Sequence, residues 1–112
     1  MVEIREYRDP GGQSPFGDWR SRLDTAARRK ISVLLYRLGL GNFSNVKGVG
    51  SGVFESKINF GPGYRVYFGK DGEEIVILLG GGTKQRQQSD IAQSISRWED
   101  YKQRKKAQKD KE

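Results

Sequence analysis

Polarity alternates at the start of the chain, where Val2 and Ile4 are apolar and Glu3 and Arg5 are charged. Successive side chains of a strand point to opposite faces, so this pattern predicts a strand over residues 2–7 with one covered face. The turn-forming sequence Asp-Pro-Gly-Gly at positions 9–12 ends that strand.

Apolar residues then recur at helical spacing in two successive segments. A serine followed by a proline at positions 14–15 is typical of a helix start, and Asp24 is a suitable cap for the next helix. The first helix has an apolar face of Phe16, Trp19 and Leu23. The second has a longer apolar stripe of Ala27, Ile31, Leu34, Leu35 and Leu38. Glycines at 39 and 41 end the second helix.

Strand-like segments dominate the second half of the chain. Residues 43–52 are rich in Gly, Ser and Asn and predict a loop. Strands are expected over residues 53–58, 64–68 and 74–79, and Asp71-Gly72 is a strong hairpin signal between the last two. The triple glycine at 80–82 predicts a flexible exit from the sheet.

A final helix is expected to start near Gln87 to Asp90 and to bury Ile91, Ile95 and Trp98. The order of elements predicts one α+β domain over residues 1–101, with a mainly antiparallel four-stranded sheet and helices packed on one of its faces. Residues 102–112 are basic and lack an apolar stripe, so a frayed or disordered tail is expected there.

Charge narrows the range of partners. The net charge of +7 and the isoelectric point of about 9.8 favour a polyanion such as RNA or DNA, although an acidic protein or a membrane surface would also fit. Residues 1–5 do not resemble a signal peptide, and there is no apolar run long enough to span a membrane, so we expect a cytoplasmic protein.

The absence of His and Cys narrows the chemistry. It removes the usual zinc sites, thiol catalysis and histidine acid–base catalysis. We therefore expect a site without a metal ion or cofactor that uses Asp, Glu, Lys, Arg, Tyr or Ser.

Strand periodicity places several of these residues on one face. Glu55 and Lys57 share a face of their strand, as do Arg65 and Tyr67 of the next. Because a short turn joins these strands, we expect the four side chains to cluster on the open face of the sheet. The segment 84–87, which contains Lys84, Arg86 and Gln87, would close one side of the cluster.

Such a cluster suits RNA cleavage by the RNA's own 2′-hydroxyl. Arg65 would hold the scissile phosphate, because its planar fork matches phosphate geometry. A lysine crowded by other cations, Lys57 or Lys84, can take part in proton transfer, and either Glu55 or Asp90 would act as base. Tyr67 would stack on a base or position a hydroxyl. Arg86, Gln87, Lys102 and Arg104 would add contacts to RNA.

Simpler interpretations compete with these roles. Alternating charges on a strand often form only a solvated face with cross-strand ion pairs. The sequence Gly-Gly-Gly-Thr-Lys lacks the spacing of a phosphate-binding loop. Trp19 and Trp98 are better explained as core residues than as stacking platforms, and the basic tail as a solvated end.

The sequence resembles a known toxin family in two long segments. Residues 52–58 and the Gly-Pro-Gly-Tyr-Arg-Val-Tyr-Phe sequence at 61–68 are similar to the addiction module killer protein (HigB/RelE-like) branch of the RelE/ParE toxin superfamily. Residues 78–91 continue the resemblance, as do Phe16-x-x-Trp19 and Gly41-Asn42 upstream. The resemblance covers about residues 2–101.

The resemblance implies a toxin of a type II toxin–antitoxin system that cleaves mRNA on the ribosome and is neutralised by an antitoxin, typically of the helix-turn-helix type. By position, Arg65 matches the arginine that contacts the scissile phosphate, and Lys57 and Lys84 match basic residues near it. Thr83, Ser56 and Arg86 depart from the residues usual in the branch. The tyrosine that acts near the last helix in RelE-type members is not evident in this sequence, and Asp90 is nearby instead. The proton-transfer roles are therefore the least specified.

Two other functions remain open on the same fold. One is a ParE-like inhibitor of DNA gyrase, and the other is a degenerate toxin that only binds its antitoxin or nucleic acid. The combination of Arg65, Lys57 and Lys84 favours mRNA cleavage, because a gyrase inhibitor has no need of a phosphate-binding cluster. The fold alone cannot decide between them.

Overall fold

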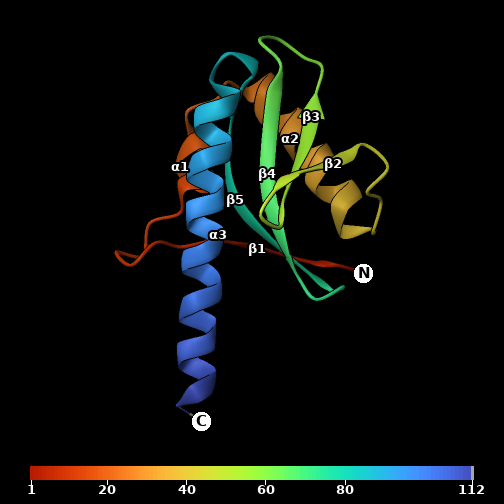
Figure 1. Ribbon diagram of the computed structural model, residues 1–112. Helices are drawn as coiled ribbons and strands as arrows, with labels where there is room; N and C mark the ends of the chain where they lie inside the picture. Colours follow the sequence, from red (N-terminus) through yellow and green to blue (C-terminus); the bar gives the residue numbers. More distant parts are fainter. Residues whose placement is uncertain (112) are drawn as a thin grey trace.

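The computed structural model describes residues 1–111 and confirms the α+β class (Figure 1). Two helices, α1 (Pro15–Ser21) and α2 (Thr25–Gly39), follow β1 (Glu3–Glu6). Four strands come next: β2 (Val46–Gly50), β3 (Val53–Ile58), β4 (Tyr64–Asp71) and β5 (Ile75–Thr83). A short 3-10 turn, η1 (Lys84–Arg86), leads into α3 (Gln87–Asp110).

The first two helices start as the sequence predicts. The Ser14 side chain accepts a hydrogen bond from the Gly17 amide, with Pro15 at the first helical position. The Asp24 carboxylate accepts one from the Ala27 amide at the start of α2. Both caps satisfy backbone donors that have no partner inside the helix.

The sheet has five strands in the order β1-β5-β4-β3-β2, so the expectation of four strands is wrong. The additional strand, β2, lies in the predicted loop at 43–52 and pairs antiparallel with β3. Its turn into β3 uses positive φ angles at Gly50 (111°), Ser51 (53°) and Gly52 (82°), which glycine adopts without strain. β1 pairs parallel with β5, so the sheet is mixed.

The helices cover both faces of the sheet, so the expectation that they pack on one face is also wrong. Helices α1 and α2 cover one face, where the buried apolar residues are Phe16, Ile31, Leu34, Leu38, Val66, Phe68, Val76 and Leu78. Helix α3 covers the other face and packs on Val53, Tyr67, Ile77 and Leu79 through Trp98. In Figure 1, α3 (blue) and α2 (orange-brown) lie on opposite sides of the sheet.

The triple glycine is part of β5 rather than a flexible exit. A Cβ atom on Gly81 would lie 2.3 Å from the Trp19 ring of α1. On the opposite face, a Cβ on Gly82 would lie 1.8 Å from the Asp90 carboxylate of α3, and one on Gly80 2.7 Å from Arg97 Nη1. The glycines are needed because helices approach this end of the strand from both sides.

Helix α3 continues to Asp110, where the sequence analysis expects a frayed tail beyond residue 101. The Tyr101 hydroxyl donates to Asp71 (2.6 Å) at the end of β4, and Lys105 also pairs with Asp71. Arg104 pairs with Asp100 (2.7 Å) and donates to the Arg8 carbonyl. The contacts with Asp71 and with the Arg8 carbonyl hold this part of α3 against the body in place of the missing apolar stripe. Residue 112 lies outside the described residues. No helix in the described part of the chain combines the length and apolar character that a membrane span requires.

Candidate functional site

The strand register brings together the residues that the sequence analysis groups on one face. Lys57 of β3 lies directly opposite Arg65 of β4, and Glu55 lies opposite Tyr67. All four belong to the face that α3 covers, because Tyr67 and Val53 pack in the same cluster as Trp98. The predicted grouping of these residues is therefore found in the structure.

The face is not open, however. Glu55 is 2% exposed, Arg65 5% and Tyr67 0%, because the start of α3 lies over them. A side chain that is fully buried cannot stack on a nucleobase, so the expected stacking role of Tyr67 is wrong for this conformation. Lys57, at the edge of the group, is exposed.

Glu55 is the centre of the polar contacts. Its Oε2 atom lies 3.7 Å from Arg65 Nε and accepts a hydrogen bond of 2.8 Å from Gln87 Nε2. Its Oε1 atom lies 3.7 Å from Lys47 Nζ. The buried carboxylate is thus held between two cations and the first residue of α3.

Lys47 is a site residue that sequence analysis missed. It lies directly opposite Glu55 in the pairing of β2 with β3. Its position opposite Glu55 would have identified it, but this position cannot be inferred when residues 43–52 are predicted to be a loop.

Gly63 links Arg65 to Lys84. The Gly63 carbonyl accepts one hydrogen bond from Arg65 Nη1 (3.2 Å) and another from the Lys84 amide (2.9 Å). Gly63 has a φ of 79°, which favours glycine, and a Cβ there would touch both residues at 3.6 Å. The turn before β4 therefore places the exposed Lys84 beside the buried Arg65.

Two atoms of this cluster have no hydrogen-bond partner within residues 1–111: Arg65 Nε and the Tyr67 hydroxyl. Burial, followed by the nearby Glu55 carboxylate charge, holds the pKa of Tyr67 well above its usual range. Tyr67 is therefore a neutral phenol at physiological pH, and a hydroxyl donor that is free to pair.

Other predicted RNA-binding residues lie elsewhere. Lys102 pairs with Glu99 (3.0 Å) and Arg104 with Asp100 on the second half of α3. Along the helix axis, Lys102 is about 22 Å from Gln87, at 1.5 Å per residue. Arg86, the last residue of η1, and Asp90 of α3 line a cleft between α3 and α1. Of the predicted contacts in α3, only Gln87 reaches Glu55.

Asp90, the alternative base, is partly buried against Gly82 of β5. Burial raises the pKa of its carboxyl, although the charges of Arg86 and Arg97 act in the opposite direction. Its Oδ2 atom has no hydrogen-bond partner in the described chain.

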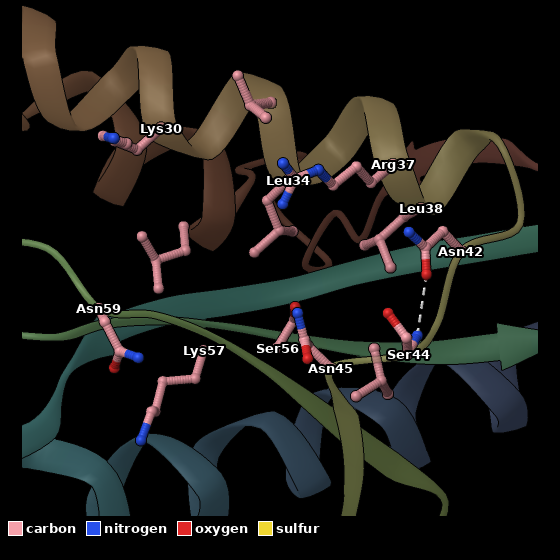
Figure 2. Close-up of a pocket in the computed structure, with 13 residues that line it drawn as sticks. Lys30, Leu34, Arg37, Leu38, Asn42, Ser44, Asn45, Ser56, Lys57 and Asn59 are labelled. Atoms are coloured by element: carbon pink, nitrogen blue, oxygen red, sulfur yellow. Dashed lines mark hydrogen bonds between the residues drawn. The ribbon is translucent and has the colours of Figure 1, made fainter.

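A separate groove of about 360 Å³ lies between α2 and the β2–β3 pair (Figure 2). Its apolar lining comprises Val33, Leu34, Leu38, Val46 and Ile58. Figure 2 shows Lys30 and Arg37 on α2, and Lys57 pointing away from α2 toward the other face. The groove is next to an exposed apolar stripe on α2, formed by Val33, Tyr36 and Leu40.

The Glu55 cluster combines a fixed cation, a carboxylate and exposed lysines without histidine. Within residues 1–111, no three Asp, Glu, His or Cys residues gather closely enough to bind a metal ion together. These side chains can hold an anion and exchange protons with it.

Comparison with known proteins finds a relative in Haemophilus influenzae. The chain is 44% identical over 80 residues to an uncharacterized protein of Haemophilus influenzae, and the match covers 70% of this chain and 81% of the relative. The sequence matches no family model. At this identity and coverage, the chain belongs to the same family as the Haemophilus influenzae protein.

Proposed function

We propose that this chain, as a member of that family, is the toxin of a type II toxin–antitoxin system that cleaves mRNA on the ribosome without a metal ion. The observation that carries the proposal is the cluster of Arg65 and Glu55, 3.7 Å apart, with Lys47, Lys57 and Lys84 around them. The net charge of +7 supports attraction to ribosomal and messenger RNA.

The cluster supplies the groups that transesterification of RNA requires. The 2′-oxygen attacks the adjacent phosphorus, and its proton passes to the Glu55 carboxylate. The bond from phosphorus to the 5′-oxygen breaks, and a lysine ammonium, Lys57 or Lys84, protonates the leaving oxygen. The products are a 2′,3′-cyclic phosphate and a 5′-hydroxyl. Arg65 stabilises the charge that builds up on the phosphate.

The first residue of α3 controls access in this mechanism. Gln87 donates to Glu55, and Arg65 is 5% exposed, so a phosphate reaches the guanidinium only after the Gln87 side chain swings away. Binding to the ribosome would supply the free energy for that movement. This requirement agrees with a toxin that acts only on translated mRNA.

The groove between α2 and the β2–β3 pair is our proposed docking site for the antitoxin. Its apolar floor and the cations Lys30 and Arg37 suit an amphipathic segment with acidic residues. The charge reversal Lys30→Glu with Arg37→Glu should weaken a complex with the product of the adjacent gene, while RNA cleavage continues. Unchanged affinity in a pull-down with this double variant would argue against the groove.

The cleavage proposal is best tested with Lys57→Ala, because the Lys57 side chain is exposed and its loss leaves the core intact. Induction of the wild type should produce new RNA ends within translated messages. Loss of a proton-transfer group should lower cleavage by roughly 10²–10⁴-fold. Arg29→Ala, an exposed cation on α2, is the matched control and should cleave as the wild type does. Full cleavage by Lys57→Ala would remove this lysine from the mechanism, and absence of new ends with the wild type would overturn the proposal.

A gyrase inhibitor is the second candidate, and the exposed stripe of Val33, Tyr36 and Leu40 on α2 favours it, because this stripe is suited to bind a protein. In that case the purified chain should inhibit DNA supercoiling by gyrase, and Tyr36→Ala should relieve the inhibition. Lys57→Ala should have no effect on it.

A further inference from the structure

The second half of α3 carries most of the positive charge of the chain. Residues 102–111 contain six cations and one acid, whereas the net charge of the whole chain is +7. Every one of these residues is exposed, and Figure 1 shows this end of α3 (dark blue) projecting past the sheet and past helices α1 and α2. The proposed cleavage site lies at the other end of the helix, beside Gln87, so the cleavage mechanism does not use this charge.

The cations follow two opposite sides of the helix. Lys102, Lys106 and Lys109 are four and three residues apart, so their side chains lie along one side. Arg104 and the C-cap residue Lys111 lie along the opposite side, because a helix turns by about 200° over the two residues from Lys102 to Arg104. Two positively charged flanks therefore run along this end of α3.

The outward side between these flanks is uncharged over most of its length. Tyr101 and Lys105 mark the side that faces the body, because both contact Asp71. Gln103 and Ala107 lie about half a turn away from that side, and therefore between the two flanks. The major groove of B-form DNA is about 12 Å wide, similar to the diameter of a helix (about 10–12 Å), and has phosphates along both edges. The arrangement of side chains on this helix therefore matches that groove.

We propose that the second half of α3 binds double-stranded DNA in the major groove. Lys106 and Lys109 contact phosphates along one edge of the groove, and Lys111 contacts those along the other. Asp110 is the acid of this segment, and it lies between Lys109 and Lys111, which also offset the partial negative charge at the C-terminal end of the helix. A single strand fits less well because residues 102–111 include no aromatic side chain on which bases could stack. An RNA duplex fits less well because its major groove is deep and narrow.

The cations of this segment differ in whether an acid of the protein already pairs with them. Those nearer the body are paired: Lys102 with Glu99, Arg104 with Asp100 and Lys105 with Asp71. The pair with Asp71 joins α3 to β4 and holds the helix in one orientation, so DNA binding requires little ordering of the chain. Within residues 1–111, no ion pair involves Lys106 or Lys109, and both are exposed. These two lysines are therefore available to phosphates.

Fluorescence anisotropy of a labelled DNA duplex with the purified full-length chain tests the proposal. Each phosphate neutralised in B-form DNA contributes about −0.9 to the slope of log affinity against log salt concentration. The slope should therefore become shallower by roughly 2 in the double variant Lys106→Gln with Lys109→Gln. Arg28→Gln with Arg29→Gln removes the same charge from the exposed side of α2, so this matched control should keep the wild-type slope. An equal change in both double variants, or no salt-dependent binding by the wild type, would overturn the proposal.

The same sequence as an RNA duplex and as a DNA single strand separates insertion into the groove from general attraction to phosphate. The DNA duplex should bind most tightly, because its major groove admits a helix. Equal binding of the two duplexes would show that α3 contacts the phosphate backbone without entering the groove. Tighter binding of the RNA duplex or of the single strand would show that double-stranded DNA is not the partner, and either result would contradict the proposal. These measurements need no ribosome, so they stand or fall separately from the proposal of mRNA cleavage.

Discussion

The two faces of the sheet are covered by helices in different ways. The face under α1 and α2 is mainly apolar, from Phe16 to Leu78, with Ser56 as a buried polar residue opposite Val66. The face under α3 is apolar around Trp98 but buries polar groups toward the start of the helix. Of the five buried polar atoms without a partner in residues 1–111, four lie between α3 and the sheet: those of Arg65, Tyr67, Asp90 and Ser94.

This difference separates stability from function. A buried polar atom without a partner reduces stability, whereas a close-packed apolar side chain increases it. The α2 side therefore holds the fold together, and the α3 side tolerates unfavourable groups that are useful for binding and catalysis. Substitutions on the two sides should differ in a corresponding way.

The largest loss of stability is expected for Phe16→Ala on the α2 side. Phe16 is 1% exposed, and truncation of a buried phenylalanine lowers the free energy of unfolding by about 3–5 kcal/mol. Urea denaturation measures this decrease. A loss below that of Arg65→Ala would show that the hydrocarbon side is not the main source of stability.

A smaller loss is expected for Arg65→Ala on the α3 side. The variant leaves the buried Glu55 with only the solvent-exposed Lys47 as a cation, so the free energy of unfolding should fall by about 1–3 kcal/mol. Toxicity should be lost as well. Arg65→Lys, which keeps the charge, should recover part of the stability but little toxicity, because its point charge lacks the arginine fork. Full toxicity of Arg65→Ala at equal expression would exclude Arg65 from phosphate binding.

The variant Asp71→Asn should lower the free energy of unfolding by about 0.5–1 kcal/mol. The loss is small because the contacts of Asp71 with α3 are partly exposed. They also predict two pH windows in the wild type. The bonds from Lys105 and Tyr101 lower the pKa of Asp71, so its contribution to stability is present above the usual pKa of an aspartate and is lost as the pH falls through the lowered value. Burial, followed by the bond to Asp71, raises the pKa of Tyr101 to about 12. Its contribution is therefore complete below a pH of about 10 and is lost as the pH rises through 12.

Thermal unfolding across this pH range distinguishes these contributions. In Asp71→Asn the acid-dependent part should disappear, and in Tyr101→Phe the alkaline part should disappear. Identical pH profiles for the wild type and both variants would show that the contacts of Asp71 with α3 do not stabilise the fold.

No loss of stability is expected for Tyr67→Phe. Tyr67 is fully buried and its hydroxyl has no hydrogen-bond partner in the described chain, so removal of the hydroxyl should raise the free energy of unfolding, by up to about 1–3 kcal/mol. A loss of stability would show that the hydroxyl is paired in solution, and it would contradict the contrast between the two faces at this position.

Local patterns in the sequence predict much of this molecule. The caps at Ser14 and Asp24 and the apolar stripe of α2 depend on residues a few positions apart, and the common face of Glu55 and Arg65 depends on two strands joined by a short turn. The missed features depend on distant residues. The coverage of Tyr67 by α3 requires Gly80 and Gly82 to admit a helix at close range, and periodicity within the strand contains no sign of this.

The second half of α3 and strand β2 were not predicted for the same reason. Residues 102–110 have no apolar stripe, and the helix there is fastened to the body by Tyr101, Arg104 and Lys105 through partners in β4 and near Arg8. Strand β2 contains two glycines within five residues and becomes recognisable only through its pairing with β3. Lys47 was missed together with β2. Lys102 was expected as an RNA contact in a frayed tail, but it lies in the second half of α3 and pairs with Glu99.

The parallel pairing of β1 with β5 also has a consequence for how the chain folds during its synthesis. Glu3 pairs with Ile75 and Glu6 with Leu78, so β1 finds its neighbour only after the ribosome has added residues 75–78. Pairing between such distant segments is slow to form, and unpaired strand edges promote aggregation. A nascent chain that stops before residue 75 therefore contains β1 without its partner. The folded sheet, and any activity that depends on it, therefore exists only once β5 has been made.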